Sequence, residues 1–192
     1  RTVGGILHLG GTILKPSSFE PLREGAVDAV RQAFLDQELD AVVAIGGEHT
    51  MEITRQLHAD HGLPLVGVPK TIDNDVGGTD FTFGFDTAVQ IVTDAIDRLH
   101  TTAQSHDRVM VVEVMGRNTG WIAAYAGIAG GADGIVIPET TTTVEEVVEG
   151  VQRRHDRGKD FSIIVVAEGA KLAFASGEER LIQPIKDTDE YG

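Results

Sequence analysis

Short apolar runs alternate with longer amphipathic segments along this chain, and that alternation limits its fold more than any other feature. The helical signal is clearest from Ala88 to Leu99, where apolar residues recur at every third or fourth position. Pro21 is expected to open the first helix, and the second is expected to begin near Thr50. The runs that we interpret as strands cover residues 3–9, 40–45, 63–68, 108–114, 134–137 and 161–167. A repeated strand–helix order is typical of a parallel sheet with helices on both faces, so we predict an α/β fold with three Rossmann-type layers.

The composition excludes several kinds of partner. With 192 residues, of which 41% are hydrophobic, the chain is long enough to bury a core. The formal net charge of −14 argues against nucleic acid as a partner, and the absence of cysteine excludes disulfides and thiolate metal sites. No apolar run reaches the length of a membrane span and no signal peptide opens the chain. We therefore expect a cytoplasmic protein that does not bind a membrane.

The two ends of the chain indicate a piece of a longer polypeptide. An apolar segment begins at Val3, almost at the first residue, and the stretch from Asp187 to Gly192 has no closing element. We therefore expect residues 1–192 to form a single α/β region that belongs to a larger subunit.

Two carboxylates follow the apolar run 63–68 and form the most informative local pattern of the chain. Pro69 ends the run, and Asp73 and Asp75 come next, with a pair of glycines directly after them. Open α/β sheets place their ligands at the carboxyl ends of the strands, where carboxylates can hold a metal ion or accept a proton from a hydroxyl group. The alternative is a turn rich in Asp and Asn that only reverses the chain.

The other unusual loops also follow predicted strands. They cover residues 46–50, 69–78, 115–120, 138–139 and 168–169. Because the carboxyl ends of parallel strands meet at one edge of a sheet, these loops are predicted to lie together. The charged residues that this arrangement gathers into one cleft are Glu48, Lys70, Asp73, Asp75, Arg117 and Glu168. This convergence favours a site over a simple turn at Asp73 and Asp75.

Two of these loops suit a phosphorylated ligand. The glycine pair Gly46-Gly47 precedes a helix whose first N–H groups can bind an anion, and Glu48 is a candidate Mg²⁺ ligand, directly or through water. Arg117 can bind phosphate with its planar guanidinium. An ordinary tight turn capped by Thr50 and a solvated arginine remain the alternatives. Arg108 lies at the opposite end of its strand, so any role for it points toward a neighbouring subunit.

Taken together, these motifs resemble the phosphofructokinase family over essentially the whole chain. The run Pro-Lys-Thr-Ile-Asp-Asn-Asp at 69–75 is highly specific to that family. Further matches in the same order lie at residues 78–88, 112–117, 129–133, 137–139 and 167–169. Lys70 and the continuation at 118–121 resemble the bacterial branch that mixes ATP-dependent and diphosphate-dependent members. The resemblance implies a glycolytic kinase built as a two-domain subunit, active as a homodimer or homotetramer.

The resemblance also implies a reaction and a role for each matched residue. The reaction is Mg²⁺-dependent transfer of a terminal phosphoryl group from ATP or diphosphate to the 1-hydroxyl of fructose 6-phosphate. Asp73 matches the general base, Asp75 an assisting carboxylate near the metal, and Thr71 a residue that orients the phosphoryl group and the sugar. Lys70 and Mg²⁺ would supply positive charge, and Glu48 would lie near the metal. The sugar-phosphate site matches Met115, Gly116, Arg117 and Glu168, with Arg108 from the adjacent subunit. The donor site matches Gly46, Gly47, His49 and Thr50.

Three departures from the family pattern affect these expectations. The N-terminal phosphate loop and the C-terminal half of the family are absent, so the 192-residue chain alone is predicted to be inactive. His49 stands where ATP users usually have glycine and diphosphate users aspartate, whereas Lys70 is typical of diphosphate users. Ser18 stands where the family has an arginine that contacts the phosphates, and the loss of such a donor typically costs several kcal/mol of transition-state stabilisation. The donor, the effectors and the oligomer size stay open.

Three hypotheses follow. The first is an active phosphofructokinase seen in part. The second is a non-catalytic or divergent paralogue that binds sugar phosphate; the unusual residues His49 and Ser18 motivate this hypothesis. The third is a NAD or lipid kinase of similar shape, which would explain residues 46–50 but neither 69–75 nor 112–117.

Overall fold

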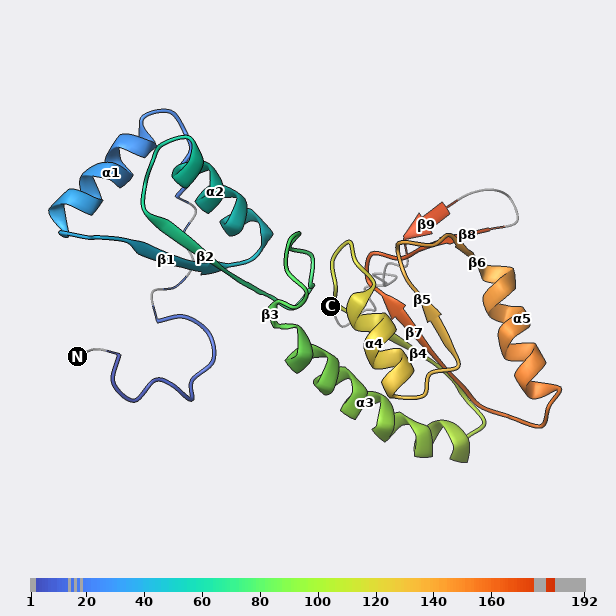
Figure 1. The fold of residues 1–192 in the computed structure, drawn as a ribbon. Helices are drawn as coiled ribbons and strands as arrows, with labels where there is room; N and C mark the ends of the chain where they lie inside the picture. Colours follow the sequence, from blue (N-terminus) through green and yellow to red (C-terminus); the bar gives the residue numbers. More distant parts are fainter. Residues whose placement is uncertain (1–2, 14, 16, 18, 175–178, 182–192) are drawn as a thin grey trace, which may run out of the picture. The chain divides into compact units, whose positions relative to one another are not determined.

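The structure is a computed structural model, and it describes residues 3–13, 15, 17, 19–174 and 179–181 (Figure 1). Ser18 therefore lies outside the described residues. The chain divides into two compact units, the first made of residues 1–43 and 52–66 and the second of residues 44–51 and 67–192. None of the described helices is long and apolar enough to cross a membrane.

The first unit contains helix α1 (Ala26–Asp36) and most of helix α2 (Glu48–Ala59). Its small apolar core includes Ala26, Leu57 and Leu63, which are almost fully buried. The prediction that Pro21 opens the first helix is wrong, since α1 begins at Ala26. The reason lies directly before the helix, where Gly25 takes a left-handed conformation with φ 73° that a right-handed helix cannot continue through.

The prediction of a strand at residues 3–9 is also wrong. The described residues there form turns, with Gly5 at φ 79° and a backbone hydrogen bond of 2.9 Å from Leu9 N to Ile6 O. Val3, Leu7 and Leu9 are each more than half exposed. Strand stability comes from pairing and from packing of one face, and these side chains pack against little of the described chain.

The remaining predicted strands are present, but they belong to separate sheets. Strands β1 (Val42–Gly46), β2 (Leu65–Thr71) and β3 (Phe83–Gly84) form one sheet in the order β1-β2-β3. The second sheet has the order β4-β7-β5 and is parallel throughout; its strands are β4 (Val109–Val114), β7 (Ser162–Ala167) and β5 (Gly134–Val136). The third sheet has the order β6-β8-β9, with strands β6 (Thr142–Thr143), β8 (Lys171–Ala173) and β9 (Glu179–Leu181). The α/β class is confirmed, whereas the strands do not join into one sheet.

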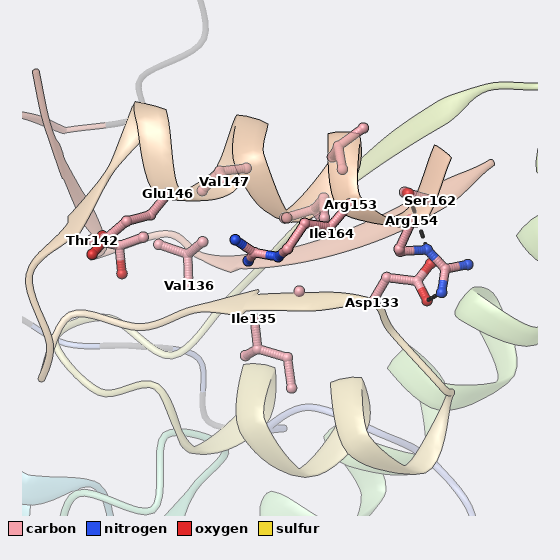
Figure 2. Close-up of a pocket in the computed structure, with 13 residues that line it drawn as sticks. Asp133, Ile135, Val136, Thr142, Glu146, Val147, Arg153, Arg154, Ser162 and Ile164 are labelled. Carbon is pink, nitrogen blue, oxygen red and sulfur yellow. Dashed lines mark hydrogen bonds and ion pairs between the residues drawn. The ribbon is translucent and has the colours of Figure 1, made fainter. Parts of the chain in front are cut away.

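The core of the second unit is built around β7. All six residues of β7 are buried, because the strand lies between β4 and β5 and is covered on both faces. Helices α4 (Trp121–Ala129) and α5 (Val144–His155) lie on opposite sides of β5, and Ile135 points toward α4 (Figure 2). Helix α3 (Phe85–Ser105) packs beside α4 and buries Phe85 and Ile96 completely. Burial of side chains of this size contributes about 1.5–3 kcal/mol each.

An ion pair fixes the C-terminal end of α5 to this sheet. Arg154 Nη1 lies 2.7 Å from Asp133 Oδ1, and Asp133 Oδ2 accepts a hydrogen bond of 2.9 Å from Ile163 N. Figure 2 shows this pair at one end of a cavity of about 200 Å³ between α5 and the strands β5 and β7. At the other end of α5, Thr143 and Glu146 form a reciprocal capping box that satisfies the first backbone N–H groups of the helix.

Candidate active site

The loop that follows β2 carries both predicted carboxylates, and Asn74 between them holds its shape. Asn74 has a left-handed backbone with φ 55°, a conformation that Asn tolerates better than most residues. Its Oδ1 accepts a hydrogen bond of 2.9 Å from Thr82 N, and its Nδ2 donates one of 3.3 Å to Asp80 O. Buried Thr82 donates through Oγ1 to Thr71 O at 2.8 Å. These bonds close the loop at residues 72–82 (hereafter the carboxylate loop) and fix the directions in which Asp73 and Asp75 leave it.

Asp73 has a raised proton affinity. Burial is the main cause that raises the pKa of its carboxyl above the ordinary value, and the negative charge of Asp75 is the second. A hydrogen bond with the Thr71 side chain and the charge of Arg117 act in the opposite direction, while Glu168 adds to the rise. A carboxylate with a raised pKa accepts a proton from a hydroxyl group more readily than an ordinary one.

Asp75 has an unsatisfied oxygen. Its Oδ1 is buried and has no hydrogen-bond partner among the described residues. A buried carboxylate oxygen without a partner is costly, so Asp75 Oδ1 is a position that a water molecule, a ligand or an ion could satisfy.

The loop that follows β4, at residues 115–120 (hereafter the arginine loop), is held by the carboxylate of Glu168, which directly follows β7. Glu168 Oε1 accepts hydrogen bonds from Gly116 N at 3.1 Å and from Arg117 N at 2.6 Å. Gly116 and Arg117 both have positive φ, at 146° and 54°, so the turn is tight and its amides point to one side. Glu168 thus uses one oxygen to shape the loop that presents Arg117.

The two loops meet directly. Thr119 Oγ1 donates to Asp73 O at 2.8 Å and also lies 3.0 Å from Gly116 O. Arg117 Nη1 lies 3.7 Å from Glu48 Oε2, and both side chains are well exposed. The structure therefore brings Glu48, Asp73, Asp75, Arg117 and Glu168 together, as their places after parallel strands predict, although the strands concerned belong to two sheets.

Residues 46–50, at the start of α2, lie beside the end of β2. Gly46 is buried, and a Cβ there would overlap the Thr50 side chain, so only glycine fits. A Cβ on Gly47 would lie 3.8 Å from Thr71 Cβ, in ordinary contact. His49 is exposed in the first turn of α2.

The remaining predicted site residues are placed as follows. Lys70 is exposed near the end of β2 and makes no ion pair with a described residue, and Met115 is exposed at the start of the arginine loop. Arg108 directly precedes β4, whose six residues span about 20 Å, so it lies at the far end of that strand from Arg117. Its separation from the other site residues agrees with the prediction.

Our sequence analysis missed the residues that hold the loops. Thr119, Thr82 and the Asn74 side chain were assigned no role, and Glu139, whose Oε1 accepts from Gly120 N at 2.8 Å, was noted only as part of a motif. An Asn between two Asp residues was a usable signal for a left-handed turn. The threonines carried no signal, since their partners are distant in sequence.

The fold and the site together define an α/β protein suited to phosphorylated ligands, because an arginine can bind phosphate while the nearby carboxylates take a proton or a metal ion. Comparison with known proteins supplies the family. The family model described as Phosphofructokinase matches residues 1–190, so the chain belongs to the phosphofructokinase family.

Relatives with either phosphoryl donor in their names are about equally similar. The chain is 56% identical over 187 residues to the pyrophosphate–fructose 6-phosphate 1-phosphotransferase of Amycolatopsis mediterranei, covering 96% of this chain and 53% of that protein. It is also 56% identical over 166 residues to the ATP-dependent 6-phosphofructokinase of Corynebacterium efficiens, covering 86% of this chain and 48% of the relative. The chain thus spans about half the length of these curated relatives.

Solved structures agree with the fold. The crystal structure of Pichia pastoris phosphofructokinase in the T-state matches with a TM-score of 0.75 at 31% identity, and the match covers 87% of this chain and 20% of that one.

Proposed function

We propose that the complete polypeptide that carries this sequence is a 6-phosphofructokinase, which transfers a phosphoryl group from ATP or diphosphate to the 1-hydroxyl of fructose 6-phosphate. The names of the relatives support the reaction. The observation that carries the proposal is Asp73, a half-buried carboxyl with a raised pKa, hydrogen-bonded through its backbone to the loop that presents Arg117. A proton acceptor tied to a phosphate-binding arginine is what a hydroxyl-to-phosphate transfer needs.

In the proposed reaction Asp73 accepts the proton of the 1-hydroxyl group. The hydroxyl oxygen forms a bond to the terminal phosphorus of the donor, and the bond from that phosphorus to its bridging oxygen breaks. ADP or phosphate leaves with the electron pair. Arg117 and Lys70 offset negative charge on the transferred group, Thr71 orients it, and Glu168 has its second oxygen available for a sugar hydroxyl. Gly46, Gly47, His49 and Thr50 would face the donor at the start of α2.

The carboxylates of this site fit Mg²⁺. No group of three or more His, Asp or Glu among the described residues could hold a metal ion without other ligands. Mg²⁺ in kinases is usually held by one or two carboxylates together with water and substrate phosphates, so a smaller set suffices. The unpartnered Oδ1 of Asp75 suits this role, and Glu48 would be the second carboxylate. When bound, the ion would neutralise charge on the donor phosphates.

The proposal extends to the assembly of the enzyme. Residues 1–192 would be part of the catalytic domain of a longer two-domain subunit, which the half-length match to the relatives supports. Arg108, at the far end of β4, would reach the sugar phosphate of an adjacent subunit in a homodimer or homotetramer. The enzyme would act in glycolysis in the cytoplasm. Either donor is compatible with the relatives, and Lys70 favours diphosphate.

The test is a measurement of turnover by the complete polypeptide with fructose 6-phosphate, Mg²⁺ and each donor in turn. Product is expected with at least one donor. Asp73→Ala should lower kcat at least about 100-fold, since general bases contribute about 10²–10⁴-fold, while calorimetry should show sugar-phosphate affinity within a few-fold of wild type.

Asp80→Asn, an exposed aspartate of the same loop, is the matched control and should leave the rate unchanged. Lack of product with both donors would contradict the proposed function, and binding without turnover would instead support a divergent paralogue. A wild-type rate in Asp73→Ala would show that the base is another residue.

A further inference from the structure

The backbone of Asp73 is held on both sides by threonine hydroxyl groups. Asp73 N donates to Thr71 Oγ1 at 3.1 Å, and Asp73 O accepts from Thr119 Oγ1 at 2.8 Å. The Cα–Cβ bond that carries the carboxyl leaves between these two fixed peptide groups. Thr71 is the last residue of β2, two positions before Asp73, whereas Thr119 belongs to the arginine loop, 46 positions after Asp73.

The Thr119 hydroxyl serves two acceptors with one hydrogen. Oγ1 lies 2.8 Å from Asp73 O and 3.0 Å from Gly116 O, while Thr119 N already donates to Gly116 O at 2.9 Å. Gly116 O is therefore satisfied without the side chain, and Asp73 O is the acceptor that depends on it. Losing the hydroxyl would free the Asp73 carbonyl and leave the turn at 116–119 closed by its backbone bond.

The arginine loop itself is firmly placed. Glu168 directly follows the buried strand β7 and accepts from Gly116 N and Arg117 N, while Glu139 accepts from Gly120 N at the other end of the loop. Thr119 thus connects the firmly held arginine loop to Asp73. The next residue, Asn74, has a left-handed backbone, so the chain turns directly after Asp73. Groups that must stay within a fraction of an ångström for catalysis need support of this kind.

We propose that Thr119 is a positioning residue that fixes the Asp73 carboxyl relative to Arg117 through the hydrogen bond from its Oγ1 to Asp73 O. This inference rests on the proposed function. Without the bond, the carboxylate loop is free to move away from the arginine loop, so that the proton acceptor and the phosphate-binding cation no longer keep one geometry.

The experiment compares Thr119→Val with Thr119→Ser in the complete polypeptide. Val keeps the size of the side chain and removes the hydroxyl, whereas Ser keeps the hydroxyl. We expect Thr119→Val to lower kcat about 10–100-fold, since a displacement of 1 Å costs about 10²-fold, with KM for the donor within about twofold of wild type. Thr119→Ser should recover most of the lost rate.

Thr93→Val is the matched control. Thr93 on α3 is half-buried and donates to Val89 O at 2.8 Å, so its substitution removes an equivalent bond away from the site. It should leave kcat unchanged. A kcat of Thr119→Val equal to that of Thr93→Val would overturn the proposal, as would a loss in Thr119→Ser as large as in Thr119→Val.

A second measurement does not depend on turnover. Hydrogen exchange of the carboxylate loop, measured by mass spectrometry without substrate, reports how firmly residues 72–82 are held. A loop freed by Thr119→Val should exchange faster than in wild type, whereas Thr119→Ser and Thr93→Val should leave its exchange unchanged. Equal exchange of the loop in wild type and Thr119→Val would overturn the proposal even if wild type proved inactive, an outcome that would count separately against the proposed function.

Discussion

At the scale of single residues, the environment that suits Asp73 to its proposed role as a base also has a cost to folding. The same burial and neighbouring charge that raise its pKa disfavour its ionised form in the folded protein. In the unfolded chain the carboxyl titrates at its ordinary pKa of about 3.9. As pH rises the unfolded state therefore loses this proton first, and the folded state is destabilised relative to it once pH exceeds that value.

Replacing Asp73 by Asn should therefore stabilise the fold at neutral pH while it abolishes turnover. The expected result is a higher Tm for Asp73→Asn than for wild type at pH 7, measured by calorimetry or circular dichroism. The difference should shrink as pH falls through the raised pKa and vanish below the ordinary one. Asp80→Asn, at an exposed position, should show no such difference. A lower Tm for Asp73→Asn at pH 7 would show that the carboxylate stabilises the loop.

At the scale of elements, the backbone that follows β7 packs closely against the backbone of the arginine loop. Gly169 directly follows Glu168, and a Cβ at this position would overlap the backbone oxygen of Arg117. Gly169 does not have a positive φ, so a side chain is excluded here by lack of space and not by backbone conformation. The carboxylate that shapes the loop and the glycine that lets it approach are thus consecutive residues.

Gly169→Ala should displace the arginine loop. We expect a loss of about 1–3 kcal/mol in the free energy of unfolding, as is typical of overpacking, and about tenfold weaker binding of fructose 6-phosphate to the complete polypeptide by calorimetry. Gly10→Ala is the control, because a Cβ there meets nothing within 4 Å and the backbone needs no positive φ. Equal effects of the two substitutions would show that the loop adapts freely.

The same elements show what the sequence can and cannot predict. The strands that precede Arg117 and Glu168 were found because a continuous apolar run is long enough to identify. Strand β3 has two residues and was missed, and Val3–Leu9 was mistaken for a strand because an apolar run does not show whether it has a partner. The bond from Thr119 to Asp73 joins residues 46 positions apart, in two loops with positive φ at Arg117 and Asn74, and no local pattern at Thr119 indicates it.

At the scale of the whole molecule, the described strands differ sharply in burial. Every residue of β7 is buried between two neighbouring strands, whereas in β1 Val43 and Ile45 are 59% and 64% exposed. Amides of a buried central strand exchange only through large-scale unfolding, while those of a poorly covered strand exchange through local opening. In the 192-residue chain the amides of Ser162–Ala167 should therefore exchange at least about tenfold more slowly than those of Val42–Gly46.

In the complete polypeptide, the hydrogen exchange of β1 should be slower than in the 192-residue chain. If residues 1–192 are about half of a longer subunit, as the match to the relatives supports, the remaining half is available to cover Val43 and Ile45. Hydrogen exchange of Val42–Gly46, measured by mass spectrometry, should then slow at least about tenfold in the complete polypeptide, corresponding to about 1.4 kcal/mol of added local stability. Val165 and its neighbours in β7 provide the internal reference, because they are already buried. Unchanged exchange in β1 would mean that the rest of the subunit packs elsewhere and that the side chains of Val43 and Ile45 are exposed in the enzyme as well.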